Sequence, residues 1–92
     1  SKPKIKIQNM VASANLHSKI DLETACDVLD NLMYEPEIFP GLIYRMKDPK
    51  TVLLLFSSGK LVCTGAKNEE MVNESVTKMY EILQDYDLLF TD

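Results

Sequence analysis

Three short runs near the middle of the chain are rich in aliphatic and β-branched residues and are separated by turn-forming residues. Runs of this length and composition are typical of β-strands. Asp48 and Pro49 mark the first turn, and Ser57, Ser58 and Gly59 mark the second. The pattern predicts a meander of antiparallel strands over residues 42–46, 51–56 and 61–64.

The second of these strands is apolar on both of its faces. Because successive side chains of a strand point to opposite sides, Val52, Leu54 and Phe56 share one side. Leu53 and Leu55 point to the other. Such a strand is usually covered on both faces, yet only two helical patterns occur elsewhere, enough to cover one face of a small sheet. We expect the second face, which we call the open face, to be covered by something outside the chain.

The flanking segments predict one further strand and two helices. Residues 5–14 alternate between two faces and predict a first strand. Apolar residues at helical spacing predict a helix from an N-cap at Asp21 to about Leu32, and a longer amphipathic helix after an N-cap at Asn68. Two prolines exclude helix from residues 34–41 and predict an extended edge segment with a turn. The expected fold class is α+β, a single layer of helices on one sheet.

Several apolar residues and both cysteines belong to these elements. Met33 falls on the apolar stripe of the first predicted helix. Residues 88–90 are more apolar than a free tail should be, and we expect them to dock on the sheet or on a neighbour. Cys26 and Cys63 lie in a helical and a strand pattern without CxxC spacing. We therefore expect two buried free thiols, and neither a zinc site nor a disulfide.

The length and composition suit one small domain. The chain has 92 residues, 46% of them hydrophobic, so we expect a single domain over residues 1–92. No apolar run approaches the ~20 residues needed to cross a bilayer, and no signal-peptide pattern opens the chain. These features predict a soluble, intracellular protein with no membrane partner.

Acidic and basic residues are separated along the chain. The net charge of −4 would normally argue against nucleic-acid binding. The predicted strands lie in residues 1–19 and 38–67, which carry +4 each, whereas the helix-rich residues 20–37 and 68–92 carry −6 each. If helices cover one face and strands present the other, the molecule is an electrical dipole with a basic open face.

The sequence offers little catalytic chemistry. His17 lies in a predicted loop with no second metal ligand at useful spacing, so we expect a solvated residue and no metal site. Glu35 and Glu37 have no other polar group converging on them, which favours a solvated acidic edge over acid–base catalysis. Asn9 shares a strand face with apolar residues, and two roles stay open: a hydrogen bond to a turn, or a ligand contact. With no Gly-rich phosphate loop and no nucleophile elbow, we expect neither an enzyme nor a bound cofactor.

The expected open face has an apolar centre and a basic rim, which suits the minor groove of DNA. The narrow groove offers a degenerate pattern of acceptors that small polar groups can read, while cations meet the flanking phosphates. Phe39 and Phe56 lie on neighbouring elements and together could form a wedge between base steps. The centre is predicted to hold Val11, Val52, Leu54, Phe56 and Val62 with Asn9 and Thr64, and the rim Arg45, Lys50, Lys60 and Lys67.

Four segments in this order and spacing resemble the TATA-box-binding protein family. They read IKIQNMVAS, YEPEIFPGLIYRM, VLLLFSSGK and VCTGAK, and the resemblance covers nearly the whole chain, from Ile5 to about Tyr86. It implies a curved antiparallel sheet with two helices packed on its convex face and a concave face that binds double-stranded DNA. Its implied DNA contacts are Asn9, Val11, Leu54, Val62 and Thr64 in the minor groove, Phe39 and Phe56 as an intercalating pair, and Arg45, Lys50, Lys60 and Lys67 on phosphates.

The same resemblance implies protein partners. Glu35 and Glu37 match an acidic edge at which transcription factor B docks in the family, so they become candidate partner contacts. Family members carry two imperfect repeats in tandem, whereas this chain holds one, most similar to the second. We therefore expect a homodimer or association with a second repeat, because a lone repeat leaves its first strand as an exposed edge.

The leading hypothesis is a transcription-initiation module that binds and bends TATA-box DNA. One alternative is an interaction module of the same fold that binds a protein instead of DNA, a role that the net charge of −4 favours. Another is an accessory domain of a nucleic-acid enzyme. A DNA-binding role implies the nucleus in a eukaryote, and the cytoplasm or nucleoid in an archaeon.

Overall fold

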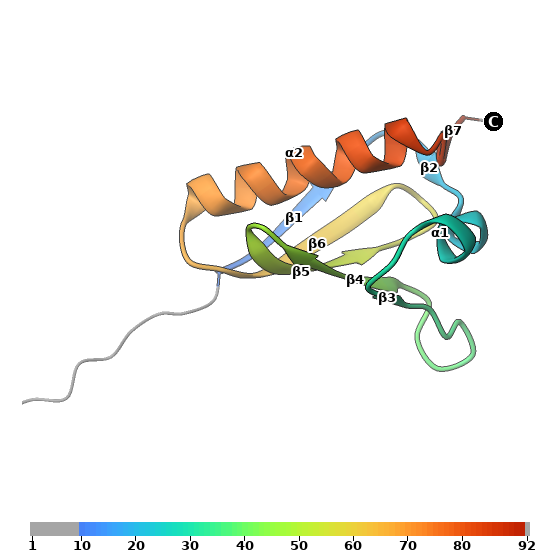
Figure 1. Ribbon diagram of the computed structural model, residues 1–92, viewed down its shortest axis with the longest axis horizontal. Coiled ribbons are helices and arrows are strands. Elements are labelled where there is room, and N and C mark those ends of the chain that lie inside the picture. Colours follow the sequence, from blue (N-terminus) through green and yellow to red (C-terminus); the bar gives the residue numbers. More distant parts are fainter. Residues whose placement is uncertain (1–9, 92) are drawn as a thin grey trace, which may run out of the picture.

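A computed structural model describes residues 10–91 and shows one five-stranded antiparallel sheet in the order β1-β6-β5-β4-β3 (Figure 1). Its central hairpins pair β4 with β5 and β5 with β6. The predicted meander is therefore confirmed. Strands β4 and β6 extend one or two residues beyond their expected ends, and β5 is shifted by one residue toward the N-terminus. The five strands are β1 (Met10–Asn15), β3 (Leu32–Met33), β4 (Leu42–Lys47), β5 (Lys50–Leu55) and β6 (Lys60–Ala66).

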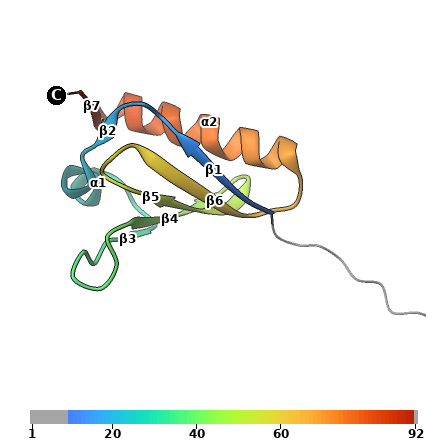
Figure 2. The ribbon, with the colours of Figure 1, turned by 180° about the vertical axis from the view of Figure 1, so that it is seen from behind.

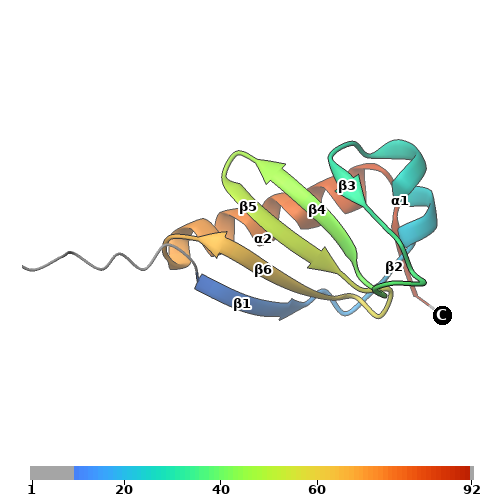
Figure 3. The same ribbon diagram turned by 90° about the horizontal axis from the view of Figure 1, so that it is seen from below.

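The long helix α2 (Glu69–Asp85) crosses one side of this sheet, as the two opposite views show (Figures 1 and 2). It begins at the predicted N-cap, where the side chain of Asn68 accepts a hydrogen bond from the backbone N–H of Met71 at 2.8 Å. Viewed from below, the sheet lies in front of α2 and presents its other side to the viewer (Figure 3). Within residues 10–91, no helix covers that side, which is the open face predicted from the strand pattern.

The burial of β5 confirms the predicted separation of the two faces. Leu53 and Leu55 are fully buried under α2, whereas Val52 and Leu54 are half-buried. Leu42 on β4 and Leu61 on β6 pair with Leu55 and are buried as well. The helix-covered core is thus a continuous apolar layer that also includes Met79 and Leu83 of α2.

The first helix is shorter than expected. Helix α1 (Leu22–Val28) begins at the predicted N-cap, Asp21, whose carboxylate accepts from the Thr24 backbone N–H at 3.0 Å. It ends four residues early, because Leu29 adopts extended backbone angles and the Asn31 carbonyl accepts from the Arg45 N–H at 2.9 Å. Residues 32–33 then pair with β4 as strand β3. Met33 therefore lies on an edge strand, and its assignment to the helix stripe was wrong.

The C-terminal apolar segment docks within its own chain. Leu88 is 1% exposed, and strand β7 (Leu89–Phe90) pairs with β2 (Lys19–Ile20) in a separate two-stranded sheet. Among residues 10–91, no helix is both long and apolar enough to cross a membrane.

The two cysteines differ in burial, contrary to the expectation of two buried thiols. Cys63 on β6 is buried, whereas Cys26 on α1 is exposed, because α1 turns Leu22 and Ala25 toward the core. Loss of hydration next to the surrounding protein raises the pKa of both thiols, including that of the exposed Cys26. The negative charges of Asp27 and Glu23 raise the pKa of Cys26 further.

We expect one thiol per chain to react with a maleimide reagent in the folded protein, and two after denaturation. Because the Cys26 pKa is raised, its reaction should be slower at neutral pH than that of a free cysteine and should accelerate as the pH rises. Mass spectrometry after timed labelling measures both numbers. Labelling of Cys63 at the same rate as Cys26 in the folded state would contradict the assigned burial.

Candidate nucleic-acid interface

Two aromatic rings lie together at one end of the open face. The rings of Phe39 and Phe56 meet edge to face, with centroids 5.9 Å apart and planes at 69°. Gly41 lies directly beneath them: a Cβ on Gly41 would lie 2.7 Å from Cε2 of Phe39 and 2.9 Å from Cε1 of Phe56. The glycine therefore gives both rings the space in which they pair, and Phe39 stays 36% exposed.

Apolar side chains form the next row across the sheet. The pairing places Ile43, Leu54 and Val62 side by side on β4, β5 and β6, and all of them are half-buried. Ser13 on β1 pairs with Val62 and extends this row to the sheet edge. The centre of the open face is thus apolar with a small hydroxyl at its border.

The third row combines one cation, one valine and one hydroxyl. Arg45 pairs with Val52, which pairs with Thr64. The Thr64 hydroxyl donates to the Val52 carbonyl at 3.2 Å, so it must leave this bond before it can donate to a bound ligand. Beside Thr64, Val11 lies at an irregularity of the β1–β6 pairing and is 72% exposed.

Cations gather at the end of the sheet opposite the phenylalanine pair. Lys47 and Lys50 pair directly across the β4–β5 hairpin, and both are exposed. Together with Arg45 and Lys67 they line one hollow. Like charges directly opposite on neighbouring strands are destabilising. A bound anion between the two lysines would relieve this repulsion.

Lys60 lies apart from the other cations, beside the aromatic rings. Its carbonyl accepts from the Phe56 N–H at 3.0 Å. Its side chain and that of Phe56 line a second shallow hollow, whose polar lining comes from Ser13, Asn15 and Ser58. Positive charge therefore flanks the apolar centre at both ends.

Two glutamates and a histidine singled out in the sequence lie on exposed loops. Glu35 and Glu37 are exposed on the loop between β3 and β4, where the Glu35 carbonyl accepts from the N–H groups of Ile38 and Phe39, both at 2.9 Å. The predicted turn in this loop is confirmed. Asn9 lies outside the described residues, and His17 is exposed in a loop as expected. Residues 10–91 contain no group of three His, Cys, Asp or Glu side chains that could hold a metal ion.

Sequence reasoning missed five residues of this surface, among them Ser13 on β1. Ile43 and Lys47 lie two residues before and after Arg45 on β4. They therefore share its face of the strand, and strand parity alone would have placed them on the open face. Met33 pairs with Ile43 and was assigned to a helix instead. Gly41 gave no signal, since its importance lies in the contact of two rings above it.

The surface so assembled is an apolar band with an exposed aromatic pair, small hydroxyls and a cationic border. Its apolar side chains can contact an apolar surface of a ligand, and its cations can meet anionic groups at the border. Its acidic counterpart lies on α2, whose first turn holds Glu69 and Glu70.

Comparison with known proteins identifies the family. The model of the family described as transcription factor TFIID, or TATA-binding protein, matches residues 4–86. The TATA-box-binding protein of Sulfurisphaera tokodaii is 62% identical over 86 residues, which are 94% of this chain and 43% of that protein. That of Pyrodictium occultum is 63% identical over 83 residues, 90% of this chain and 42% of the relative.

A solved structure shares the fold. The Methanococcus jannaschii TBP superposes with a TM-score of 0.85 at 45% identity, over 91% of this chain and 50% of that chain. The chain thus spans about half the length of the relatives it matches. The similarity covers the whole sheet, both helices and the residues of the open face, and on this evidence the chain belongs to the TATA-binding protein family.

Proposed function

We propose that the open face binds the minor groove of TATA-like double-stranded DNA and bends it, as a module of transcription initiation. The observation that carries this proposal is the exposed Phe39–Phe56 pair at the end of an apolar, cation-flanked sheet face. The family is itself the standard example of apolar wedges that unstack base steps from the minor groove. The chain would act as one repeat-sized domain, at the genome and hence inside the cell.

The chemistry of the face supports this assignment. A minor groove rich in A·T pairs presents acceptors only, and a flat apolar sheet contacts its sugar edges without unpaired polar groups. The proposed groove contacts are Asn9, Val11, Leu54, Val62 and Thr64, the wedge is Phe39 with Phe56, and the proposed phosphate contacts are Arg45, Lys50, Lys60 and Lys67 together with Lys47.

The acidic net charge does not oppose this function, because many of the acids belong to the helices and not to the open face. Asp21 and Glu23 belong to the start of α1, and Glu69 and Glu70 to the start of α2. Separated charges orient the molecule as it approaches DNA, with the cationic face leading. This orientation favours rapid and salt-sensitive association.

Affinity for a TATA-containing duplex should fall steeply with salt. Four or five phosphate contacts correspond to a slope of log affinity against log salt of about −3.6 to −4.5. Replacing Lys60 with methionine should reduce the magnitude of this slope by about one. Fluorescence anisotropy titrations at several salt concentrations measure both values.

The matched control is Asn73→Asp, which changes the net charge equally but lies on α2, on the far side of the sheet. Its slope should equal that of the unmodified protein. A slope near zero for the unmodified protein would instead favour an open face that binds a protein partner.

Two further partners belong to this proposal. The exposed carboxylates of Glu35 and Glu37, on a loop with the 79%-exposed side chain of Ile38, offer a docking edge for a transcription factor B-like protein. Strand β1 pairs only with β6 in the described sheet, so its second edge is available to a second repeat or to a second copy of the chain.

A further inference from the structure

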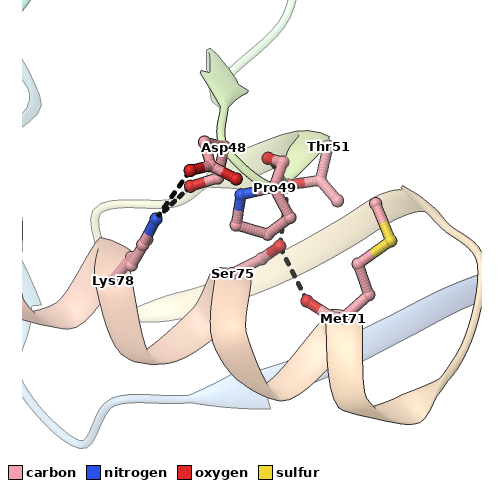
Figure 4. Close-up of polar contacts among 6 residues, drawn as sticks. All are labelled: Asp48, Pro49, Thr51, Met71, Ser75 and Lys78. Carbon is pink, nitrogen blue, oxygen red and sulfur yellow. Dashed lines mark hydrogen bonds and ion pairs between the residues drawn. The ribbon is translucent and has the colours of Figure 1, made fainter.

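Helix α2 is tied to the β4–β5 hairpin by polar contacts at the tip of that hairpin (Figure 4). The Lys78 ammonium donates to the backbone carbonyl of Asp48, and its nitrogen lies 3.9 Å from the carboxylate Oδ2 of the same residue. One turn earlier along the helix, the hydroxyl oxygens of Ser75 and Thr51 lie 2.8 Å apart. We call this set of contacts the helix–hairpin clamp.

The hydroxyl half of the clamp is buried and fully used. Ser75 is 0% exposed and Thr51 is 3% exposed. The Ser75 hydroxyl also reaches the Met71 carbonyl at 2.9 Å and the Thr51 hydroxyl the Pro49 carbonyl at 3.4 Å, so either hydroxyl can supply the hydrogen of the bond that joins them. Among the described residues, every buried side-chain nitrogen and oxygen has a partner. This bond joins helix and strand where water is excluded, so moving the two elements apart would break a buried hydrogen bond without a water to replace it.

The Lys78 half of the clamp is exposed in part, and it acts on the backbone. The Lys78 side chain is 44% exposed and the Asp48 side chain is 98% exposed. An exposed ion pair of this geometry adds little to stability. Its main contact is with a carbonyl of the turn itself, so it determines where the turn lies relative to the helix.

The same hairpin carries the cationic end of the open face. Lys47 precedes Asp48, and Lys50 precedes Thr51, so each clamped residue adjoins a lysine that points away from the helix. Lys47 and Lys50 are directly paired across the hairpin and repel one another. The clamp holds Asp48 at the tip of this hairpin and Thr51 beside it, from the opposite side of the sheet.

We infer that Lys78 and Ser75, although they lie behind the sheet, are positioning residues for DNA binding: they hold the β4–β5 hairpin so that Lys47 and Lys50 meet phosphates together. This inference rests on the DNA binding proposed above. It adds a role for the helix-covered side of the molecule, which makes no contact with DNA in that proposal. A ligand of α2 that captured Lys78 would weaken DNA binding through the hairpin.

Lys78→Met tests the inference, since methionine retains the apolar stem and removes the donor. Affinity for a TATA-containing duplex should fall about threefold to tenfold, the size expected for coupling through packed elements. The magnitude of the salt slope should fall by about one to two, because Lys47 and Lys50 lose register with phosphates. Lys78→Arg keeps a cationic donor and should restore most of both values. Thermal melting followed by circular dichroism confirms that each variant is folded at the assay temperature.

Asn73→Asp is again the matched control, because it lowers the net charge by the same amount in the shallow hollow that Asn73 shares with Lys78, while it leaves the Lys78 donor in place. It should change affinity by less than about twofold and leave the salt slope unaltered. A double-mutant cycle adds the decisive measurement: in a Lys47→Met/Lys50→Met background, Lys78→Met should have no further effect on affinity.

The outcomes separate the two proposals. If the unmodified chain binds DNA and Lys78→Met matches Asn73→Asp in affinity and slope, the positioning role is wrong and the DNA-binding function stands. Full additivity in the double-mutant cycle would also overturn the positioning role. If the unmodified chain binds no TATA-containing duplex even at low salt, the proposed function itself fails, and the positioning role fails with it.

Discussion

Replacing both Phe39 and Phe56 with alanine should abolish the bending of a TATA-containing duplex while the protein stays folded. The two rings form one edge-to-face unit above Gly41. Phe56 continues the parity of the half-buried Leu54, opposite to that of the buried Leu55, so the pair belongs to the open face. A wedge must be bulky to unstack a base step, and alanine is too small for this. The apolar rows and the cations remain, so the double variant should still bind DNA, more weakly and in a nearly straight form.

The effect on stability should be small for such a large truncation. The loss of a partly exposed aromatic pair should cost about 1–2 kcal/mol. Leu55→Ala is the matched control, because Leu55 is the neighbour of Phe56 in sequence but is buried under α2. That single substitution should cost about 2–5 kcal/mol. Urea denaturation of both variants gives the comparison.

Fluorescence energy transfer between dyes at the two ends of the duplex measures the bend directly. The double variant should show the end-to-end distance of free DNA at saturating protein. Bending at the level of the unmodified chain would mean that the rings do not enter the duplex. Loss of the fold, at a cost of about 3–5 kcal/mol per ring as for core phenylalanines, would mean that the face assignment is wrong.

In solution, the chain should be a homodimer at micromolar concentration, joined through β1. This strand is the long free edge of the described sheet, since the other edge is the two-residue strand β3. Val11 is 72% exposed on it, and an exposed apolar edge invites pairing with another strand. Two copies related by a two-fold axis would form one continuous sheet, with a phenylalanine pair at each end.

Light scattering from high to low micromolar concentration tests this expectation without DNA. The mass should be twice that of one chain and should fall toward one chain on dilution. Val11→Lys should shift the protein to monomer, because a lysine on an edge strand blocks pairing. Met33→Lys is the control, since Met33 is an exposed apolar residue, 51% exposed, on the opposite edge; it should leave the mass unchanged.

A monomeric mass at every concentration would remove the dimer from the mechanism, and a single chain would then bind half a site. The C-terminal segment packs within its own chain, although Phe90 stays 47% exposed. It was expected to reach a neighbour as one possibility, but Leu88 is buried in its own chain and β7 pairs with β2.

The sequence by itself determined the three central strands, both helix starts and the division of the sheet into two faces. These features depend on neighbouring residues: alternation in β5 separates Leu53 from Leu54, and the N-caps at Asp21 and Asn68 bond to residues three positions later. The separation of charge between strand-rich and helix-rich segments is likewise a property of the sequence alone.

Only the tertiary structure decided the features that depend on distant residues. Helix α1 stops early because β4 pairs with residues 32–33, so backbone bonds to another element outweigh the helical spacing of Met33. Gly41 becomes a site residue only because Phe39 and Phe56 meet above it. The role of Lys78 depends on a contact between residues thirty positions apart. Local periodicity indicates which side of an element is apolar. It carries no information about which distant group will complete a hydrogen bond or lie against the same atoms, and the candidate site depends on such distant contacts.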